Sequence, residues 1–354
     1  SRPLVNSVWE ICLSDHQEAL FLTHSGIPSE NEIGIKEIPI NRIIRKGTFC
    51  ILILIFGRIN FCYENFLYQW IGYINLNWIE NMLKTYAVIG DPIDHSLSPT
   101  IHNAAYRELG MECTYIGYRV IQGDLATGIE SLKKIKIAGF NVTIPHKIEM
   151  MKYLDNVDGN CKKIGAVNTV LNDDGILRGF NTDMDGFLEP IKRKEISIKN
   201  SRILLLGAGG AARAIVTGFQ KENAKNITII NRTKNNGDEL AKFSNELGLS
   251  AISKAIEDMN ELDSNFDFIV NASSLGLKNE KNIIPEKFFN EQTTVYDIVY
   301  KPVKTDLINK AKEKNCKIIF GYEMLLGQAI RSFEIWLDKK APYEIMKRSI
   351  LGGF

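Results

Sequence analysis

Two charged side chains in polar, loop-like stretches are the first candidates for chemistry in this sequence. Lys147 ends the stretch GFNVTIPHK (139–147), and Asp183 lies within GFNTDMDG (179–186). Lysine and aspartate are residue types that act as general acids or bases on a substrate oxygen. Each also has a structural alternative, because Lys147 would be solvated and Asp183 would cap the following helix.

Hydroxyl and amide side chains recur in comparable stretches. Ser96 and Ser98 lie in DHSLSP (94–99), Asn168 lies in GAVNTV (165–170), and the C-terminal part adds YDIVYKP (296–302) and GYEMLLGQA (321–329). Such groups, at strand ends and loops, suit a site for a small polyol acid. The alternatives are that Ser98 caps the next helix and that Asn168 serves a turn.

The stretch before Lys147 predicts a strand. Alternation puts Asn141 and Thr143 on one face, so that Thr143 can face a cleft while Val142 and Ile144 pack behind. We interpret His146 as a surface or supporting residue. We expect no metal site, because the histidines lack a spaced set of carboxylate or cysteine partners.

The stretch RILLLGAGGAARA (202–214) predicts a strand, a glycine turn and a helix that starts near Gly210. Gly207, Gly209 and Ala212 match the pattern of dinucleotide-binding loops. These positions allow the tight turn, the backbone approach to a pyrophosphate and close helix–strand packing, respectively. The helix start then offers N–H groups to the phosphates.

The residues after the next strand, ITII, predict which dinucleotide binds. NAD sites place an acidic residue there to bind the ribose 2′-hydroxyl. This chain has Asn231, Arg232 and Thr233 instead. Arg232 attracts a 2′-phosphate, in a contact that contributes about 1.5–3 kcal/mol. We therefore expect NADP rather than NAD.

Composition excludes several classes of protein. Of the 354 residues, 45% are hydrophobic and 24% charged, and the net charge is +1, so no global field favours nucleic acid or an anionic membrane. The longest apolar run, FCILILIF (49–56), is much shorter than the ~20 residues of a membrane-spanning helix and predicts a buried strand. The six cysteines form no CxxC pair, so we expect reduced thiols and a cytoplasmic protein.

The chain has two compositions. Residues 1–81 contain no methionine and three of the four tryptophans, and we leave them as an unassigned N-terminal extension. From Met82, strand and helix patterns alternate, which predicts an α/β fold with parallel strands and crossover helices. We expect a substrate domain over 82–184, completed by C-terminal helices over 322–354, and a Rossmann-like NADP domain over 185–321, with a cleft between them.

In the order in which they occur, these motifs resemble the shikimate dehydrogenase family. The resemblance runs from Tyr86 to about Ala329 and also includes the stretches NRT (231–233) and NASSLG (271–276). It implies an NADP-dependent oxidoreductase that reversibly reduces 3-dehydroshikimate to shikimate, in the biosynthesis of chorismate and aromatic amino acids.

The resemblance also implies roles for individual residues. Lys147 and Asp183 are expected as the catalytic pair, and Ser96 and Ser98 as ligands of the substrate carboxylate. The other substrate-binding residues expected are Thr143, Asn168, Tyr300 and Gln328. The cofactor-binding residues expected are Gly207, Ala208, Gly209, Gly210, Ala211, Asn231, Arg232, Thr233, Ile298, Gly321 and Met324.

One departure and two rivals qualify the interpretation. NADP-selective members of the family often have an arginine where this chain has Asn236, although Lys234 lies nearby. The rival enzyme is a quinate/shikimate dehydrogenase of broader specificity that uses NAD. The rival from another class is a nucleotide-sensing regulator without activity, which intact Lys147 and Asp183 oppose. We expect a small-molecule substrate, no nucleic acid or membrane partner, and a monomer or homodimer.

Overall fold

The computed structural model describes residues 9–13, 18–23, 34–39, 84–263 and 265–353. The chain divides into two compact units, 1–76 and 77–354. In the first unit, β1 (Trp9–Leu13), β2 (Glu18–Thr23) and β3 (Gly34–Pro39) form an antiparallel sheet with β2 in the centre. The sequence interpretation had not assigned this sheet. The predicted strand at 49–56 lies outside the described residues.

The second unit begins with a mixed six-stranded sheet, whose order is β5-β4-β6-β8-β9-β7. Its strands are β4 (Lys84–Gly90), β5 (Cys113–Arg119), β6 (Gly139–Val142), β7 (Asn156–Val157), β8 (Thr169–Asp173) and β9 (Ile176–Phe180). Its helices are α5 (Ser98–Glu108), α6 (Leu125–Lys134), the 3-10 helix η1 (Glu149–Tyr153) and α7 (Gly159–Ile164). We call this part, 84–180, the first lobe.

Alternation along β4 shows why the mixed sheet is covered on both faces. Tyr86 and Val88 belong to the core cluster that includes residues of α5, whereas Ala87 and Ile89 belong to the cluster that includes residues of α6. All four are buried. A strand with both faces in a core needs apolar residues at every position, as this one has.

Part of the mixed sheet differs from the predicted all-parallel arrangement. β4 pairs in parallel with β5 and β6, but β8 is antiparallel to both β6 and β9. The tight turn between β8 and β9 is made by Asp174 and Gly175, with φ of +49° and +92°. An Asp-Gly pair between two strands is typical of a hairpin with both turn residues at positive φ. The Asp174–Gly175 pair is therefore a local sequence signal for the antiparallel pairing of β8 and β9.

The third sheet is fully parallel, with the order β12-β11-β10-β13-β14-β15. Its strands are β10 (Arg202–Leu206), β11 (Asn226–Ile230), β12 (Ser250–Lys254), β13 (Phe268–Asn271), β14 (Thr294–Asp297) and β15 (Lys317–Phe320). Helices α9 (Gly210–Lys221), α10 (Lys234–Glu246) and α11 (Asp306–Glu313) and the 3-10 helices η2 (Glu257–Glu261) and η3 (Glu286–Phe288) complete this second lobe, 202–320. The strand order is that of a Rossmann fold, as predicted.

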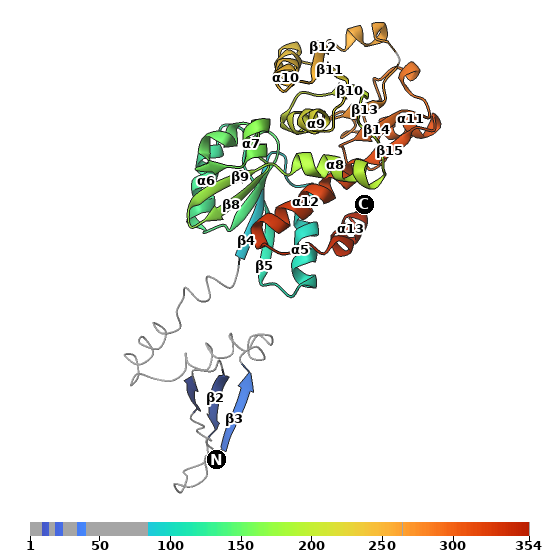
Figure 1. Cartoon of the computed structure of the whole chain (residues 1–354). Helices are drawn as coiled ribbons and strands as arrows, with labels where there is room; N and C mark the ends of the chain where they lie inside the picture. Colours follow the sequence, from blue (N-terminus) through green and yellow to red (C-terminus); the bar gives the residue numbers. More distant parts are fainter. Residues whose placement is uncertain (1–8, 14–17, 24–33, 40–83, 264, 354) are drawn as a thin grey trace. The chain divides into compact units, whose positions relative to one another are not determined.

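Two helices lie between the lobes (Figure 1). α8 (Asp183–Arg193) and α12 (Gly321–Leu337) pack against each other, and α8 also packs on α9 of the second lobe. α13 (Tyr343–Leu351) packs on α5. The domain limits predicted at 184/185 and 321/322 each fall inside one of these connecting helices. The division into a substrate domain and an NADP domain stays a prediction.

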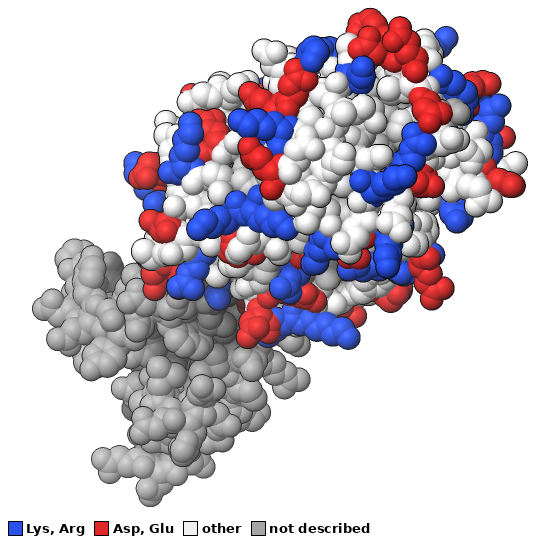
Figure 2. All heavy atoms as spheres, turned by 45° about the horizontal axis from the view of Figure 1, so that its top comes forward, with Lys and Arg blue, Asp and Glu red and all other residues white. Residues whose placement is uncertain are grey.

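Surface charge and helix length give two further facts about the described residues. On the face shown in Figure 2, acidic and basic side chains are interspersed. No helix in the described part of the chain is long and apolar enough to span a membrane.

Candidate active site

Lys147 and Asp183 meet as an ion pair. Lys147 Nζ donates to Asp183 Oδ2 at 2.6 Å, and the two side chains are only 14% and 5% exposed. Lys147 follows the turn after β6, and Asp183 is the first residue of α8. Both alternatives are thereby excluded, since Lys147 is not solvated and the N-cap position of α8 is Thr182 rather than Asp183.

The turn that carries Lys147 is fixed by backbone and ring hydrogen bonds. The His146 N–H donates to the Thr143 carbonyl, and the Val167 N–H donates to the Lys147 carbonyl at 2.8 Å. The His146 ring is fully buried, with Nε2 2.6 Å from the Val120 carbonyl oxygen, to which it donates. These bonds bring Lys147 back towards the sheet after the strand has ended.

One expectation about this stretch was wrong, and one of the two alternatives for His146 is excluded. β6 ends at Val142, so the alternation of the strand does not continue, and Ile144 is 65% exposed rather than packed behind the strand. His146 is buried and is not a surface residue. The turn after β6 exposes Ile144 and buries His146. The alternation of a strand predicts facing only within the strand and does not extend to such a turn.

Asn168 joins the pair to α12. Its Nδ2 donates to Asp183 Oδ1 at 3.0 Å and to Thr182 Oγ1 at 2.8 Å, and it lies 3.4 Å from Gln328 Oε1. Its Oδ1 accepts from the Thr182 N–H at 2.7 Å. Asn168 therefore holds the carboxylate of Asp183 and serves no turn of its own. The predicted residues Asn168, Asp183 and Gln328 therefore form one connected group with Lys147.

A second polar layer lies behind this group and was not predicted. Asn141 Nδ2 is 3.0 Å from each of three acceptors: the Asn168 carbonyl, Thr169 Oγ1 and Ser332 Oγ. Its Oδ1 accepts from the Tyr115 hydroxyl at 2.6 Å. Strand alternation had placed Asn141 on the face of Thr143, which was a usable signal. The partners come from distant segments, which the sequence did not connect.

The two serines lie at the start of α5, and Ser98 reaches the same network. Ser98 is buried and is the first residue of α5, with Leu97 rather than Ser98 as the N-cap, and its N–H donates to Ser96 Oγ at 3.3 Å. Burial raises the pKa of Tyr115 well above its usual value, and a side-chain hydrogen bond with Ser98 partly offsets that rise. Ser98 is thus close to Tyr115, whose hydroxyl donates to Asn141.

Thr143 and Tyr300 are half-buried residues for which no side-chain bond to Lys147 is found in the described structure. The Thr143 methyl group packs against Gly90, where a Cβ would overlap with it. Tyr300 packs against the core cluster of α5 and α12, and burial raises the pKa of its hydroxyl. The structure therefore does not join these two predicted ligands to the Lys147 group.

The glycine loop after β10 has the geometry of a phosphate site. Gly207 has φ +102°, and a Cβ there would lie 2.7 Å from the Ala272 carbonyl oxygen, so only glycine fits. A Cβ at Gly209 would meet nothing within 4 Å, which leaves the backbone open to a ligand at the start of α9. Ala208 and Ala211 lie in the same loop and first turn. The residues present therefore fit a dinucleotide pyrophosphate.

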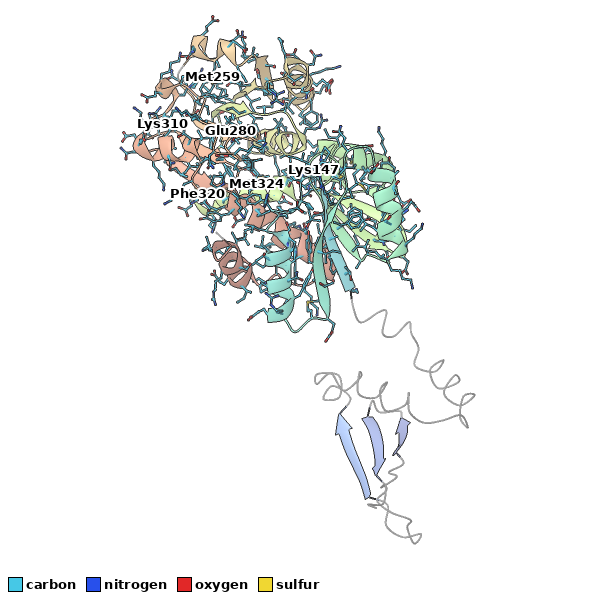
Figure 3. All side chains as sticks on the ribbon, turned by 180° about the vertical axis from the view of Figure 1, so that it is seen from behind. Lys147, Met259, Glu280, Lys310, Phe320 and Met324 are labelled. Atoms are coloured by element: carbon cyan, nitrogen blue, oxygen red, sulfur yellow. The ribbon has the colours of Figure 1, made fainter. Side chains whose placement is uncertain are left out.

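The same loop touches the catalytic candidate. A Cβ at Gly210 would lie 2.9 Å from Lys147 Cβ, so the stem of the lysine lies against the first residue of α9. Figure 3 shows Lys147 where the two lobes meet. The phosphate loop of the second lobe and the ion pair are thereby adjacent.

The segment after β11 is exposed, as an adenosine site requires. Arg232 and Thr233 face solvent, and Asn231 Nδ2 donates to the Thr233 carbonyl at 2.7 Å. Thr233 is the N-cap of α10, but its hydroxyl makes no capping bond. Lys234, in contrast, donates to both oxygens of Asp238, at 2.9 and 2.8 Å. Of the two cations, Arg232 is the better placed for a 2′-phosphate.

The remaining cofactor candidates meet at the end of β15. A Cβ at Gly321 would lie 2.5 Å from the Ile298 carbonyl oxygen, so α12 starts in contact with the loop after β14. Met324 follows one turn later and is buried. A Rossmann sheet with an open phosphate loop, and a buried lysine–aspartate pair pressed against it, define a dinucleotide-dependent oxidoreductase with two lobes.

Comparison with known proteins gives the family. Residues 88–170 match the shikimate dehydrogenase substrate binding domain, residues 190–294 match the shikimate/quinate 5-dehydrogenase domain, and residues 321–351 match the shikimate 5′-dehydrogenase C-terminal domain. A shikimate dehydrogenase (NADP⁺) of Nitrosopumilus maritimus is 62% identical over 273 residues, which are 77% of this chain and 100% of the relative. The chain belongs to the shikimate dehydrogenase family.

Solved structures agree with this assignment. A crystal structure of a shikimate dehydrogenase in complex with NADP⁺ has a TM-score of 0.70 at 36% identity, and the match covers 76% of this chain and 95% of that one. A 5-ketofructose reductase of Gluconobacter has a TM-score of 0.68 at 29% identity, over 77% of this chain and 99% of the other. The predicted fold class and family are confirmed.

Proposed function

We propose that Lys147 and Asp183 catalyse the reversible reduction of 3-dehydroshikimate to shikimate. The chain is an NADP-dependent oxidoreductase acting on a CH–OH group. The observation that supports the residue roles best is the 2.6 Å Lys147–Asp183 pair beside Gly210 of the phosphate loop.

The chemistry requires one proton donor on the protein. NADPH, when bound, supplies a hydride to the ketone carbon. Lys147 stabilises the negative charge that develops on the ketone oxygen and donates its proton there, which completes the alcohol. It then takes a proton from solvent. General acid catalysis of this kind contributes typically ~10²–10⁴-fold.

Asp183 keeps Lys147 in position for this transfer. One carboxylate oxygen accepts from Lys147 and the other accepts from Asn168, so the carboxylate is held from both sides. Because the ammonium is already held in place, little further entropy is lost when it is oriented towards the substrate oxygen. Ser96 and Ser98 would bind the substrate carboxylate, and Thr143, Asn168, Tyr300 and Gln328 would read its hydroxyl groups.

Replacement of the lysine tests the role directly. Lys147→Ala should lower kcat for shikimate oxidation at least ~10²-fold while NADP binding is kept. Asp183→Asn should also lower kcat, by a smaller factor. The control is Lys134→Ala on the exposed face of α6. Wild-type kcat in Lys147→Ala would refute the catalytic role of Lys147. Comparable kcat/KM values with quinate and with NAD would instead indicate the quinate/shikimate dehydrogenase of broader specificity.

Location and assembly are separate proposals. Cys113, Cys161 and Cys316 are free thiols, which supports a cytoplasmic protein. Cell fractionation would test this, and the result against it is recovery of the activity outside the cytoplasmic fraction. Light scattering after size exclusion would decide between the monomer and the homodimer that we expect.

A further inference from the structure

Asp297 is a buried carboxylate for which the mechanism above has no use. It is the last residue of β14, at the carboxyl end of the parallel sheet, and is 0% exposed. Its Oδ1 accepts from the Val299 N–H at 3.0 Å and from Asn271 Nδ2 at 2.9 Å, and its Oδ2 accepts from the Thr305 hydroxyl at 2.6 Å. Three donors thus converge on one side chain.

Two of these donors stand at the two ends of one loop. Val299 is the second residue of the loop after β14, and Thr305 ends the loop as the N-cap of α11, where its hydroxyl also accepts from the Ile308 N–H at 3.2 Å. The Asp297 carboxylate therefore bonds residues near both ends of loop 298–305 and holds these ends together. This loop carries Ile298, expected at the cofactor, and Tyr300, expected at the substrate.

The third donor extends the cluster to the phosphate loop. Asn271 ends β13, and its Oδ1 accepts from the Ser273 N–H at 3.1 Å and from the Ser273 hydroxyl at 2.6 Å. The backbone of Ala272 and Ser273 lies directly against Gly207, as the lack of room for a Cβ shows. One carboxylate thus organises the ends of two strands that both border the cofactor site.

Stability alone does not explain why a carboxylate, rather than an apolar side chain, stands at position 297. Burial raises the pKa of Asp297 to about 6, and the hydrogen bonds from Thr305, Val299 and Asn271 oppose that rise without abolishing it. The three groups that donate to its carboxylate are all neutral. A buried carboxylate is held at a free-energy penalty that an apolar side chain would avoid. What a carboxylate provides here is simultaneous, directional acceptance from three segments.

We propose that Asp297 is a positioning residue for hydride transfer, which sets loop 298–305 so that Ile298 and Tyr300 align the cofactor and the substrate. The proposal rests on the proposed function of the site. Small errors in the alignment of reacting atoms lower the rate of the chemical step strongly, so the effect should fall mainly on kcat.

Asp297→Asn, which keeps the shape and removes the charge, is the first test. We expect kcat for shikimate oxidation to fall about 10-fold or more, with KM for shikimate changed about threefold or less. The isotope effect on kcat with shikimate deuterated at the reacting carbon should rise, because hydride transfer becomes slower relative to product release. The control is Asp267→Asn, at the exposed residue directly before β13, whose carboxylate accepts from the Arg202 N–H at 2.7 Å.

A second pair of variants acts on one bond of the cluster. Thr305→Ser keeps the hydroxyl that bonds Asp297 and caps α11, and should retain kcat within about twofold. Thr305→Val removes the hydroxyl and should reproduce the kcat loss and the raised isotope effect of Asp297→Asn. These variants keep the proposal testable if Asp297→Asn fails to fold.

The outcomes separate this proposal from the proposed function. Normal kcat and an unchanged isotope effect in both Asp297→Asn and Thr305→Val would overturn the positioning role, even if both proteins melt earlier. A wild-type chain that does not oxidise shikimate would instead refute the proposed function. In that case NADPH fluorescence titration decides: affinity at least about threefold weaker for Asp297→Asn than for Asp267→Asn supports the role in setting the cofactor loop, and equal affinities overturn it.

Discussion

Lys147 and Asp183 are 36 positions apart in the chain, and each stands at the end of an element rather than within one. A lysine stem that crosses Gly210 and a head that is held by Asp183 leave the ammonium little freedom. Withdrawal of two charges from water is unfavourable unless their hydrogen bonds are satisfied, and Asn168 supplies the missing donor to Asp183. The hydrogen bonds that pair the two charges are therefore the same bonds that hold the Lys147 ammonium in position.

Arg232 is predicted to select the cofactor. Arg232→Ala should raise KM for NADP about 10-fold or more while KM for NAD changes little, because only NADP carries the 2′-phosphate. Steady-state kinetics with both cofactors measures this. Lys234→Ala is the control and should have the smaller effect, since Lys234 is held by Asp238. Equal changes with NADP and NAD would refute the phosphate contact.

His102 is predicted to make the fold sensitive to acid. Its ring is fully buried and stacked on Tyr115 with centroids 4.4 Å apart, and neither ring nitrogen has a hydrogen-bond partner among the described residues. Burial lowers the pKa of His102 from 6.5 to about 3. Below pH 6.5 the unfolded chain binds a proton that the folded chain excludes, so stability is lost as the pH falls from 6.5 towards 3.

Urea unfolding at two pH values tests this prediction. Between pH 7.5 and 4.5, the wild type should lose about 2–3 kcal/mol of unfolding free energy more than His102→Phe, which keeps the stacked ring and removes the titration. His95→Phe, at an exposed position, should follow the wild type. Parallel losses in the wild type and His102→Phe would contradict the prediction.

At the scale of elements, the crossing of α8 and α12 positions the site. A Cβ at Gly186 would lie 2.6 Å from the Gln328 backbone nitrogen, and a Cβ at Gly327 would lie 2.9 Å from Gly186 Cα. The two helices can touch so closely only because both have glycine at the crossing. α8 begins with Asp183 and α12 carries Gln328, so the helix separation sets the geometry around Asn168.

Gly186→Ala is therefore predicted to be harmful, although alanine favours helices. Alanine is intrinsically better than glycine in a helix by about 1 kcal/mol, but here it forces the backbones apart and should destabilise by about 1–3 kcal/mol. kcat/KM should fall as well. Gly218→Ala in α9 is the matched control, because its Cβ would make ordinary 3.4 Å contacts with Phe187 and Leu188. Equal melting temperatures of the two variants would contradict the argument.

Helices and parallel strands from Met82 onward were largely predictable, because their apolar periodicity is local. The errors lie where the chain turns. The hairpin at Asp174 and Gly175 was missed, the start of α5 was placed one residue late, and Ile144 was placed in a core. Periodicity describes which face a residue takes while an element continues, and it contains no information about where a turn redirects the chain.

At the scale of the whole molecule, α9 links the two lobes. Beside the Gly210–Lys147 contact, Arg213 Nε donates to the Ile164 carbonyl at 2.7 Å, and its guanidinium lies over the Phe243 ring at 3.9 Å. The helix whose start faces the phosphates thus also touches both segments that bring Lys147 and Asn168. The predicted phosphate loop therefore lies in contact with Lys147, for which we propose the role of proton donor.

The second unit is predicted to be active without the first. Each residue assigned to the site lies within 77–354, and the Nitrosopumilus relative is matched over its full length by 77% of the chain. A protein comprising residues 77–354 should keep kcat/KM within about twofold and melt within a few degrees of the full chain. Calorimetry and kinetics measure both. A loss of activity of 10-fold or more would show that residues 1–76 contribute to catalysis.

The sequence by itself determined the class of cofactor and the family. A glycine turn between a strand and a helix, Arg232 after the next strand, and an ordered series of short motifs are local patterns, because their chemistry depends on neighbouring residues in the chain. The tertiary structure alone decided that Lys147 pairs with Asp183, that Asn168 holds that pair against α12, and that Asp297 ties loop 298–305. These contacts join residues that are close only after the two sheets and their connecting helices have packed, and residue types and spacing do not encode such proximity.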